Sequence, residues 1–262
     1  MERSAIERAA QALLAARESG IKIPDLPEDC RPRTVEEGYA IQDALNALMG
    51  RPMGGWFLIF TSPSMQKAHR VPSAQYGRMP RDYVFPSPAR VAIGRPDEAW
   101  TLEIELVFRM ARSLPPRASL YTEDEVAAAV GAMHAGLEMV EDHYESMLGV
   151  EGPSIVADNG IEGRLVLGPA IESWRALDLA ALEVTLMKNG AAAAWGGGAQ
   201  VMGHPLKALA WLVNALSARG RTVAAGETIN TGNCLDRYCY GQAGDRVVAD
   251  CGPLGRAEAQ LI

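Results

Sequence analysis

The stretch Trp100-Thr-Leu-Glu-Ile-Glu-Leu-Val-Phe108 places two glutamates, Glu103 and Glu105, inside an apolar run. Residues i and i+2 of a β-strand point to the same face, so both carboxylates face one side and the leucine and isoleucine side chains face the other. Two such charges repel each other, and burying them unpaired would cost several kcal/mol or hold a proton on one of them. A divalent cation would remove that cost. The competing interpretation is an edge strand with both carboxylates in water.

A third candidate carboxylate is Glu138, which also lies inside an apolar segment. Three oxygen ligands that leave coordination positions open for water and substrate suit Mg²⁺ or Mn²⁺. We therefore consider Glu103, Glu105 and Glu138 together as candidate metal ligands. His143 follows Glu138 closely enough that a carboxylate and imidazole pair on a metal is an alternative.

The chain has 262 residues, of which 48% are hydrophobic, and a formal net charge of −7. This charge argues against nucleic acid as a partner, because nucleic-acid binding needs clustered Lys and Arg. No uninterrupted apolar run approaches the roughly 20 residues of a membrane helix. The first residues also lack the pattern of a secretory signal. We expect a cytoplasmic protein that binds neither membrane nor nucleic acid.

Helix signals are concentrated early in the chain. Apolar residues at helical spacing predict a helix over 4–18. Thr34 with Glu37 is a capping-box pattern that predicts a second helix. A similar pattern at Thr122 predicts a third helix through Leu137, which would place Glu138 at or just after its end.

Strand signals dominate the rest of the chain. The compact apolar run over 54–61 predicts a buried strand, and the alternating segment 181–188 runs into Asn189-Gly190, a strong hairpin signal. Helices followed by many short strands predict an α+β fold. We expect an N-terminal α/β subdomain over 1–80 and a β-rich catalytic domain over 81–262.

Short motifs follow one another in a fixed order from about Thr34 to the C-terminus, and together they resemble one known family. In order, they are G-W-x-x-x-F-T-S at 55–62 with Gln66, Tyr76-Gly77-Arg78 with Asp82, Glu103-x-Glu105, Glu138, A-D-N at 157–159, Asn189-Gly190, G-H-P-L at 203–206 with Trp211-Leu212, and Thr231-Gly232. With these motifs the sequence resembles the fumarylacetoacetate-hydrolase-like superfamily. Within it, the sequence is similar to the 2-oxopent-4-enoate hydratase and 4-oxalocrotonate decarboxylase branch.

The resemblance implies a mixed β-roll body and a bound Mg²⁺ or Mn²⁺ with Glu103, Glu105 and Glu138 as ligands. It also implies small-molecule substrates that are 2-oxo acids or their 2-hydroxydienoate tautomers. Such an acid offers two oxygens to a metal, and the cation stabilises the enolate that forms at C2. The implied activity is that of a lyase, either a hydratase or a decarboxylase. The implied assembly is a homo-oligomer, or an oligomer with a related subunit.

The sequence departs from this branch in the predicted pocket. The family pattern G-W-K-I-G reads Gly55-Trp-Phe-Leu-Ile59 here, so Phe57 occupies the lysine position and Ile59 a glycine position. A phenyl ring can neither carry a proton nor pair with a carboxylate. Ile161 stands where the family has a serine. We therefore predict a more apolar substrate pocket, formed by Phe57, Ile59, Arg78, Asp158, Ile161, Thr231 and Gly232.

Other residues must then supply the proton transfer. Asp82 aligns with an acid of the family and is the preferred acid/base residue, although a loop aspartate that binds backbone donors is an equal alternative. His143 replaces a family arginine and can carry a proton near neutral pH. Lys67 is the lysine expected nearest the pocket, and the alternative for it is a surface position.

The altered pocket keeps two further functions open. One is an isomerase, tautomerase or cyclase of the same fold that acts on a larger, more apolar substrate. The other is a catalytically silent partner subunit. Retention of the three acidic ligands argues against the silent subunit, because an idle site has no need to hold three like charges together.

Overall fold

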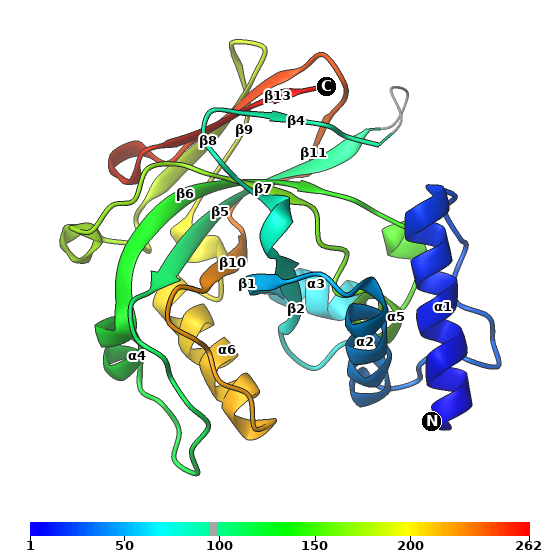
Figure 1. The fold of residues 1–262 in the computed structure, drawn as a ribbon. Coiled ribbons are helices and arrows are strands. Elements are labelled where there is room, and N and C mark those ends of the chain that lie inside the picture. Colours follow the sequence, from blue (N-terminus) through cyan, green and yellow to red (C-terminus); the bar gives the residue numbers. More distant parts are fainter. Residues whose placement is uncertain (95–98) are drawn as a thin grey trace.

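The computed structural model describes residues 1–94 and 99–262. Its larger sheet has the order β2 (Gln75–Pro80), β1 (Met53–Ile59), β10 (Thr228–Asn233), β5 (Trp100–Met110), β6 (Val130–Val140), β7 (Arg164–Leu167) and β3 (Val84–Pro86), and β11 (Cys239–Gly241) also pairs with β5. Figure 1 shows the long strands β5 and β6 curving through the middle of the molecule. They pair in antiparallel fashion along their whole length.

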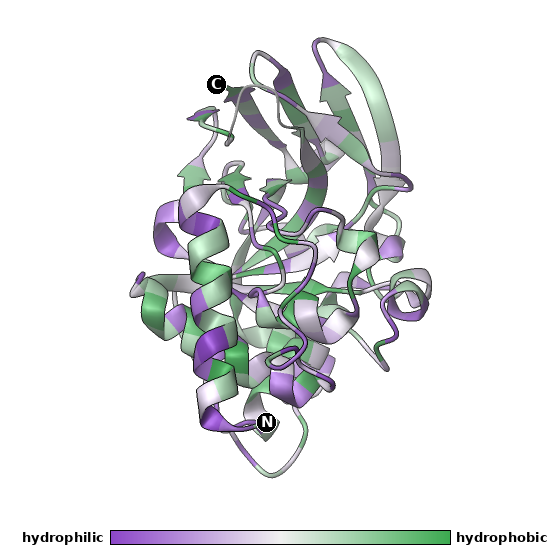
Figure 2. Ribbon diagram, turned by 90° about the vertical axis from the view of Figure 1, so that its right-hand side faces the viewer, coloured by the Kyte–Doolittle hydropathy of each residue, from purple (hydrophilic) through white to green (hydrophobic). Residues whose placement is uncertain are grey.

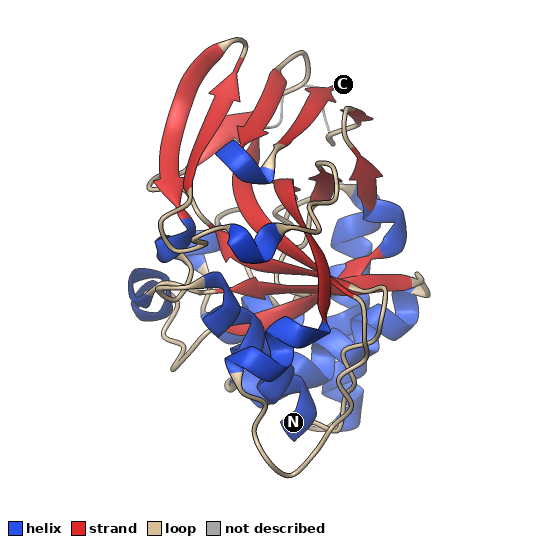
Figure 3. Cartoon of the chain, turned by 90° about the vertical axis from the view of Figure 1, so that its left-hand side faces the viewer, coloured by secondary structure: helices blue, strands red, loops and turns tan. Residues whose placement is uncertain are grey.

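The smaller sheet has the order β4 (Ala89–Val91), β13 (Arg256–Leu261), β12 (Arg246–Asp250), β8 (Glu183–Lys188) and β9 (Ala191–Gly197). The predicted hairpin is confirmed: β8 and β9 are joined by Asn189 and Gly190, whose φ angles of 53° and 85° are those of a tight hairpin turn. Strands β12 and β13 contact β6. The smaller sheet therefore covers the larger one on the side away from most helices (Figure 3).

The helices are α1 (Arg3–Ser19), α2 (Val35–Met49), α3 (Pro63–Ala68), α4 (Glu123–Ala129), α5 (Gly152–Ala157) and α6 (Pro205–Ala218). The first two predicted helices are confirmed, with Thr34 as the N-cap of α2 and Gly20 as the C-cap of α1. Helix α1 buries Ala9 and Leu13 against its neighbours, and its two-sided hydropathy is visible in Figure 2. None of the described helices is long and apolar enough to cross a lipid bilayer.

The prediction of a third helix through Leu137 is wrong. Helix α4 begins after the capping box at Thr122 but ends at Ala129, and the chain continues directly as β6. Gly131 and Gly136 make this segment a poor helix, and pairing with β5 over the whole strand satisfies its backbone groups instead. Glu138 therefore lies on a strand in the middle of the sheet and not at a helix end.

The α+β fold class is confirmed, with both sheets curled around a common core. The predicted boundary between 1–80 and 81–262 falls within the larger sheet. Strand β1 pairs in parallel with β10, with Phe57 opposite Asn230, so residues from both proposed domains are hydrogen-bonded neighbours. This pairing brings the β1 segment beside the strands that carry the three glutamates.

Candidate active site

Three carboxylates converge on one face of the β5 and β6 pair. Glu103 lies directly opposite Glu138 in the antiparallel register, and Glu105 follows Glu103 on the same face of β5. Each glutamate offers a carboxylate oxygen, and these oxygens all lie within 4.8 Å of one another. Glu105 and Glu138 are buried, and Glu103 is partly buried.

Neutral groups hold two of these carboxylates in place. The backbone N–H of Gly232 donates to Glu105 Oε2 at 3.0 Å, and that of Gly163 donates to Glu138 Oε1 at 3.2 Å. The side-chain amide of Asn230 reaches Glu138 Oε2 at 3.5 Å. These contacts orient the oxygens without neutralising their charge.

Gly232 has a structural reason to be glycine. Its φ of 101° lies in a region that other residues rarely adopt. A Cβ atom there would also lie 2.6 Å from Thr61 Oγ1, so the close approach of β10 to the end of β1 depends on the missing side chain. The backbone conformation that only glycine adopts easily therefore positions the N–H that donates to Glu105.

The pKa values of all three carboxylates are raised when no cation is bound. Burial, with the nearby Glu138 carboxylate, raises the pKa of Glu103 to about 8. Burial, followed by the charges of Glu138 and Glu103, raises the pKa of Glu105 well above its usual range. Burial also raises the pKa of Glu138. A cation that enters this cluster would replace protons and stabilise all three charges.

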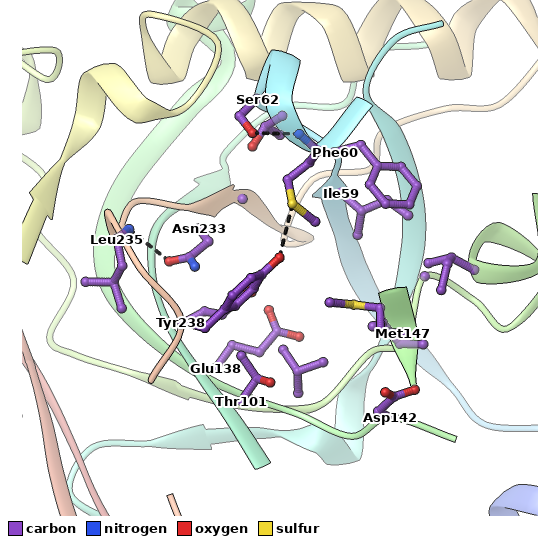
Figure 4. Close-up of a pocket in the computed structure, with 18 of the residues that line it drawn as sticks. Ile59, Phe60, Ser62, Thr101, Glu138, Asp142, Met147, Asn233, Leu235 and Tyr238 are labelled. Carbon is purple, nitrogen blue, oxygen red and sulfur yellow. Dashed lines mark hydrogen bonds between the residues drawn. The ribbon is translucent and has the colours of Figure 1, made fainter. Parts of the chain in front are cut away.

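The three glutamates lie in the wall of a cavity of about 590 Å³. Strand β1 and the residues after it supply Phe57, Ile59 and Thr61, and the loop after α5 supplies Ile161. Figure 4 shows Glu138 below the ring of Tyr238, whose hydroxyl lies 3.1 Å from Met65 Sδ across this part of the cavity. The cavity wall thus combines three carboxylates with many apolar side chains, and small-molecule sites commonly place a few polar groups among apolar ones in this way.

The fold and this site agree with comparisons to known proteins. Residues 64–262 match the family model described as fumarylacetoacetate (FAA) hydrolase C-terminal. The chain belongs to the fumarylacetoacetate hydrolase family. It is 30% identical over 230 residues to a 2-keto-4-pentenoate hydratase of Paraburkholderia xenovorans, an alignment that covers 86% of this chain and 84% of that enzyme. This similarity confirms the branch that the sequence motifs indicate.

A second relative and a solved structure belong to the same branch. A 4-oxalocrotonate decarboxylase of Pseudomonas putida is 33% identical over 138 residues, which cover 53% of this chain and 52% of that enzyme. The structure of 4-oxalocrotonate decarboxylase from Pseudomonas putida G7, complexed with magnesium and adipate, superposes with a TM-score of 0.90 at 24% identity. It covers 100% of this chain and 99% of that chain. The shared fold therefore extends over the N-terminal helices as well.

Four of the residues predicted to bind substrate line the cavity: Phe57, Ile59, Ile161 and Gly232. Phe57, at the position of the family lysine, is 2% exposed. Its ring fits because Gly77 and Gly160 lack side chains, since a Cβ atom at either would lie 2.4 or 3.1 Å from the ring. The aromatic ring is therefore built into the cavity wall.

The other three predicted substrate-binding residues, Arg78, Asp158 and Thr231, are not among the described residues that line the cavity. The Thr231 hydroxyl donates to the backbone oxygen of Leu106 at 2.8 Å. The Arg78 guanidinium lies over the ring of Trp56, 4.0 Å from its centroid. Asp158 is fully buried and accepts hydrogen bonds from Arg17. Each of these side chains has a structural partner in place of a substrate.

The structure also separates both predicted proton carriers from the three glutamates. Asp82 lies on the surface in an ion pair with Arg51. His143 lines a different and smaller cavity, and its Nδ1 atom lies 2.9 Å from Oδ2 of the buried Asp158. This bond to Asp158 also gives no support to a metal pair of Glu138 and His143. Lys67, the alternative amine, is an exposed residue of α3.

Sequence reasoning missed four charged residues that do line the cavity: Lys22, Asp142, Asp236 and Arg237. Lys22 belongs to the loop after α1, far in sequence from every family motif, so no local pattern could have placed it. Asp142 could have been found: it follows Glu138 by four residues, and residues 138, 140 and 142 all line the cavity, as strand alternation would suggest.

Proposed function

We propose that the protein is a divalent-metal-dependent lyase, a hydratase or a decarboxylase, that acts through an enolate on a 2-oxo acid or a 2-hydroxydienoate. The observation that carries this proposal is the convergence of Glu103, Glu105 and Glu138 in the wall of one cavity. Membership of a branch whose relatives are hydratases and decarboxylases supports it.

The donor set fits Mg²⁺ or Mn²⁺. All three ligand groups are carboxylates, which hard cations prefer, and their oxygens lie within 4.8 Å of one another. Three protein ligands leave positions on such an ion for two substrate oxygens and for water. When bound, the ion would polarise the 2-oxo group and stabilise the enolate that forms when a proton is lost beside it or when CO₂ leaves from a vinylogous position.

The chain's own residues would bind and orient the carbon chain of the substrate. Phe57, Ile59 and Ile161 give the cavity an apolar wall near the glutamates, which favours an unsaturated hydrocarbon chain over a second charge. The N–H of Gly232 and the amide of Asn230 would keep the ligand oxygens in place throughout the reaction.

Product analysis tests the reaction type. The purified protein would be incubated with Mg²⁺ and either 2-keto-4-pentenoate in H₂¹⁸O or 4-oxalocrotonate. Formation of a new ¹⁸O-labelled hydroxyl group at C4 identifies a hydratase, and release of CO₂ identifies a decarboxylase. Glu105→Gln should abolish either reaction, whereas Glu183→Gln, at an exposed position on β8, should leave it unchanged. Turnover that survives in Glu105→Gln would contradict the proposal.

A second candidate function is an isomerase, tautomerase or cyclase that acts on a larger, more apolar substrate. The observation that favours it is Phe57, whose ring occupies the position of the family lysine in the cavity wall. For this candidate, the same assays would show neither a new ¹⁸O-labelled hydroxyl group nor CO₂ release, and in unlabelled water a rearranged product of unchanged mass would form.

A further inference from the structure

The loop after α1 brings a lysine into the cavity. Ile23 and Tyr144 form an isolated parallel bridge, in which the Ile23 N–H donates to the His143 oxygen at 3.0 Å and the Glu145 N–H donates to the Ile23 oxygen at 2.9 Å. Lys22, directly before this bridge, lines the same cavity as the three glutamates. The backbone next to Lys22 is therefore held by hydrogen bonds to the segment that follows β6.

That segment also carries an acidic partner for Lys22. Asp142 lines the cavity, and its Oδ1 accepts a hydrogen bond of 2.9 Å from the Tyr144 N–H. Burial raises the pKa of Asp142, and the nearby Lys22 ammonium opposes this rise. Lys22 and Asp142 thus add a hydrogen-bond donor and an acceptor to the wall of the same cavity.

The Lys22 and Asp142 pair and the three glutamates line one cavity, and Asp142 is close along the chain to Glu138. Asp142 follows Glu138 by four positions, so their Cα atoms are at most about 14 Å apart. Figure 4 shows Glu138 near Tyr238 and Asp142 toward Met147, with Thr101 drawn on the Glu138 side. A substrate bound to the glutamates at one end could therefore reach the pair with the other end of its carbon chain.

The charge of the cavity restricts what that far end can be. The described lining residues include five carboxylates, from Glu103, Glu105, Glu138, Asp142 and Asp236, and two cations, from Lys22 and Arg237. Three negative charges are therefore in excess, and one would remain after a divalent ion binds. A second carboxylate on the substrate would add to this excess, whereas a hydroxyl or carbonyl group would not.

We propose that Lys22 and Asp142 form a distal subsite that binds an uncharged polar group, a hydroxyl or a carbonyl, at the end of the substrate away from the three glutamates. This inference rests on the proposed function and narrows it to a hydratase that acts on 2-oxo acids with one carboxylate and a neutral polar tail, because the decarboxylase needs a second carboxylate to release. Lys22 donates a hydrogen bond to that group, and Asp142 accepts one where the group is a hydroxyl.

Binding calorimetry in the presence of Mg²⁺ tests the subsite with four probes: oxalate, 2-oxohexanoate, 6-hydroxy-2-oxohexanoate and 2-oxoadipate. The hydroxy acid should bind about tenfold more tightly than 2-oxohexanoate, as expected for hydrogen bonds to charged groups. In Lys22→Met this difference should disappear while oxalate binding is unchanged. Asp142→Asn provides a second variant of the pair, and Lys67→Met, on the exposed face of α3, is the matched control.

Other outcomes would contradict either the subsite alone or the metal-dependent lyase as well. If the hydroxy acid keeps its advantage in Lys22→Met, or if 2-oxoadipate is the tightest ligand of the unmodified protein, the subsite is overturned while the metal site stands. If neither Mg²⁺ nor oxalate binds to the unmodified protein, the metal-dependent lyase itself is contradicted, and the subsite with it.

Discussion

Replacement of Arg17 by methionine should destabilise the protein by about 3–5 kcal/mol, the usual cost of removing one partner from a buried ion pair. The Arg17 guanidinium donates to Asp158 Oδ1 at 2.9 Å and to both oxygens of Glu162, at 2.7 and 2.9 Å. Both carboxylates are fully buried. Methionine keeps the apolar stem of the side chain but leaves these charges without their cation, although Asp158 still contacts His143.

Urea unfolding followed by circular dichroism would give the free energy of unfolding of each variant. The matched control is Arg3→Met on the same helix, since the Arg3 side chain is 92% exposed in its pair with Glu7. This control should change stability by less than about 0.5 kcal/mol. A loss below about 1 kcal/mol in Arg17→Met would refute the reasoning, because it would mean that the buried charges are stabilised without Arg17.

Two further predictions follow from the site. The pKa of Glu103 is raised from its ordinary value of 4.5 to about 8 in the folded protein. Between pH 4.5 and pH 8, the folded protein therefore binds more protons than the unfolded chain. Without divalent ions, the melting temperature should therefore fall as pH rises from about 4.5 to about 8, and less steeply in Glu103→Gln; an equal slope in both proteins would exclude Glu103 as the cause. Gly232→Ala should lower the free energy of unfolding by at least about 1 kcal/mol more than Gly226→Ala, because only the former meets a neighbouring side chain. Both glycines have positive φ angles, so equal losses in urea unfolding would show that the contact with Thr61 is relieved at no cost.

Local signals predicted the elements that depend on local chemistry. The cap at Thr34, the Asn189-Gly190 turn and the strand alternation at Glu103 and Glu105 all act over a few residues, and the structure has each of them. Glu138 was placed on the wrong element because the capping box at Thr122 marks where a helix begins but not where it ends. Only the register with β5 brings Glu138 opposite Glu103.

The parts that sequence could not predict depend on contacts between distant segments. Arg17 meets Asp158 across 141 residues, and this contact withdraws Asp158 from the cavity. Lys22 enters the cavity wall only because its loop bridges to the segment after β6. Motif order identified the family, but it could not show which polar side chains of those motifs face the substrate and which hold the fold together.

Calorimetric titration of the protein with Mg²⁺ and Mn²⁺ tests the central claim most directly. One ion should bind per chain, Glu105→Gln should weaken this binding by more than about tenfold, and Glu183→Gln should bind as the unmodified protein does. Absence of binding by the unmodified protein, or equal affinity in Glu105→Gln, would contradict a metal site at the three glutamates and would favour a catalytically silent subunit.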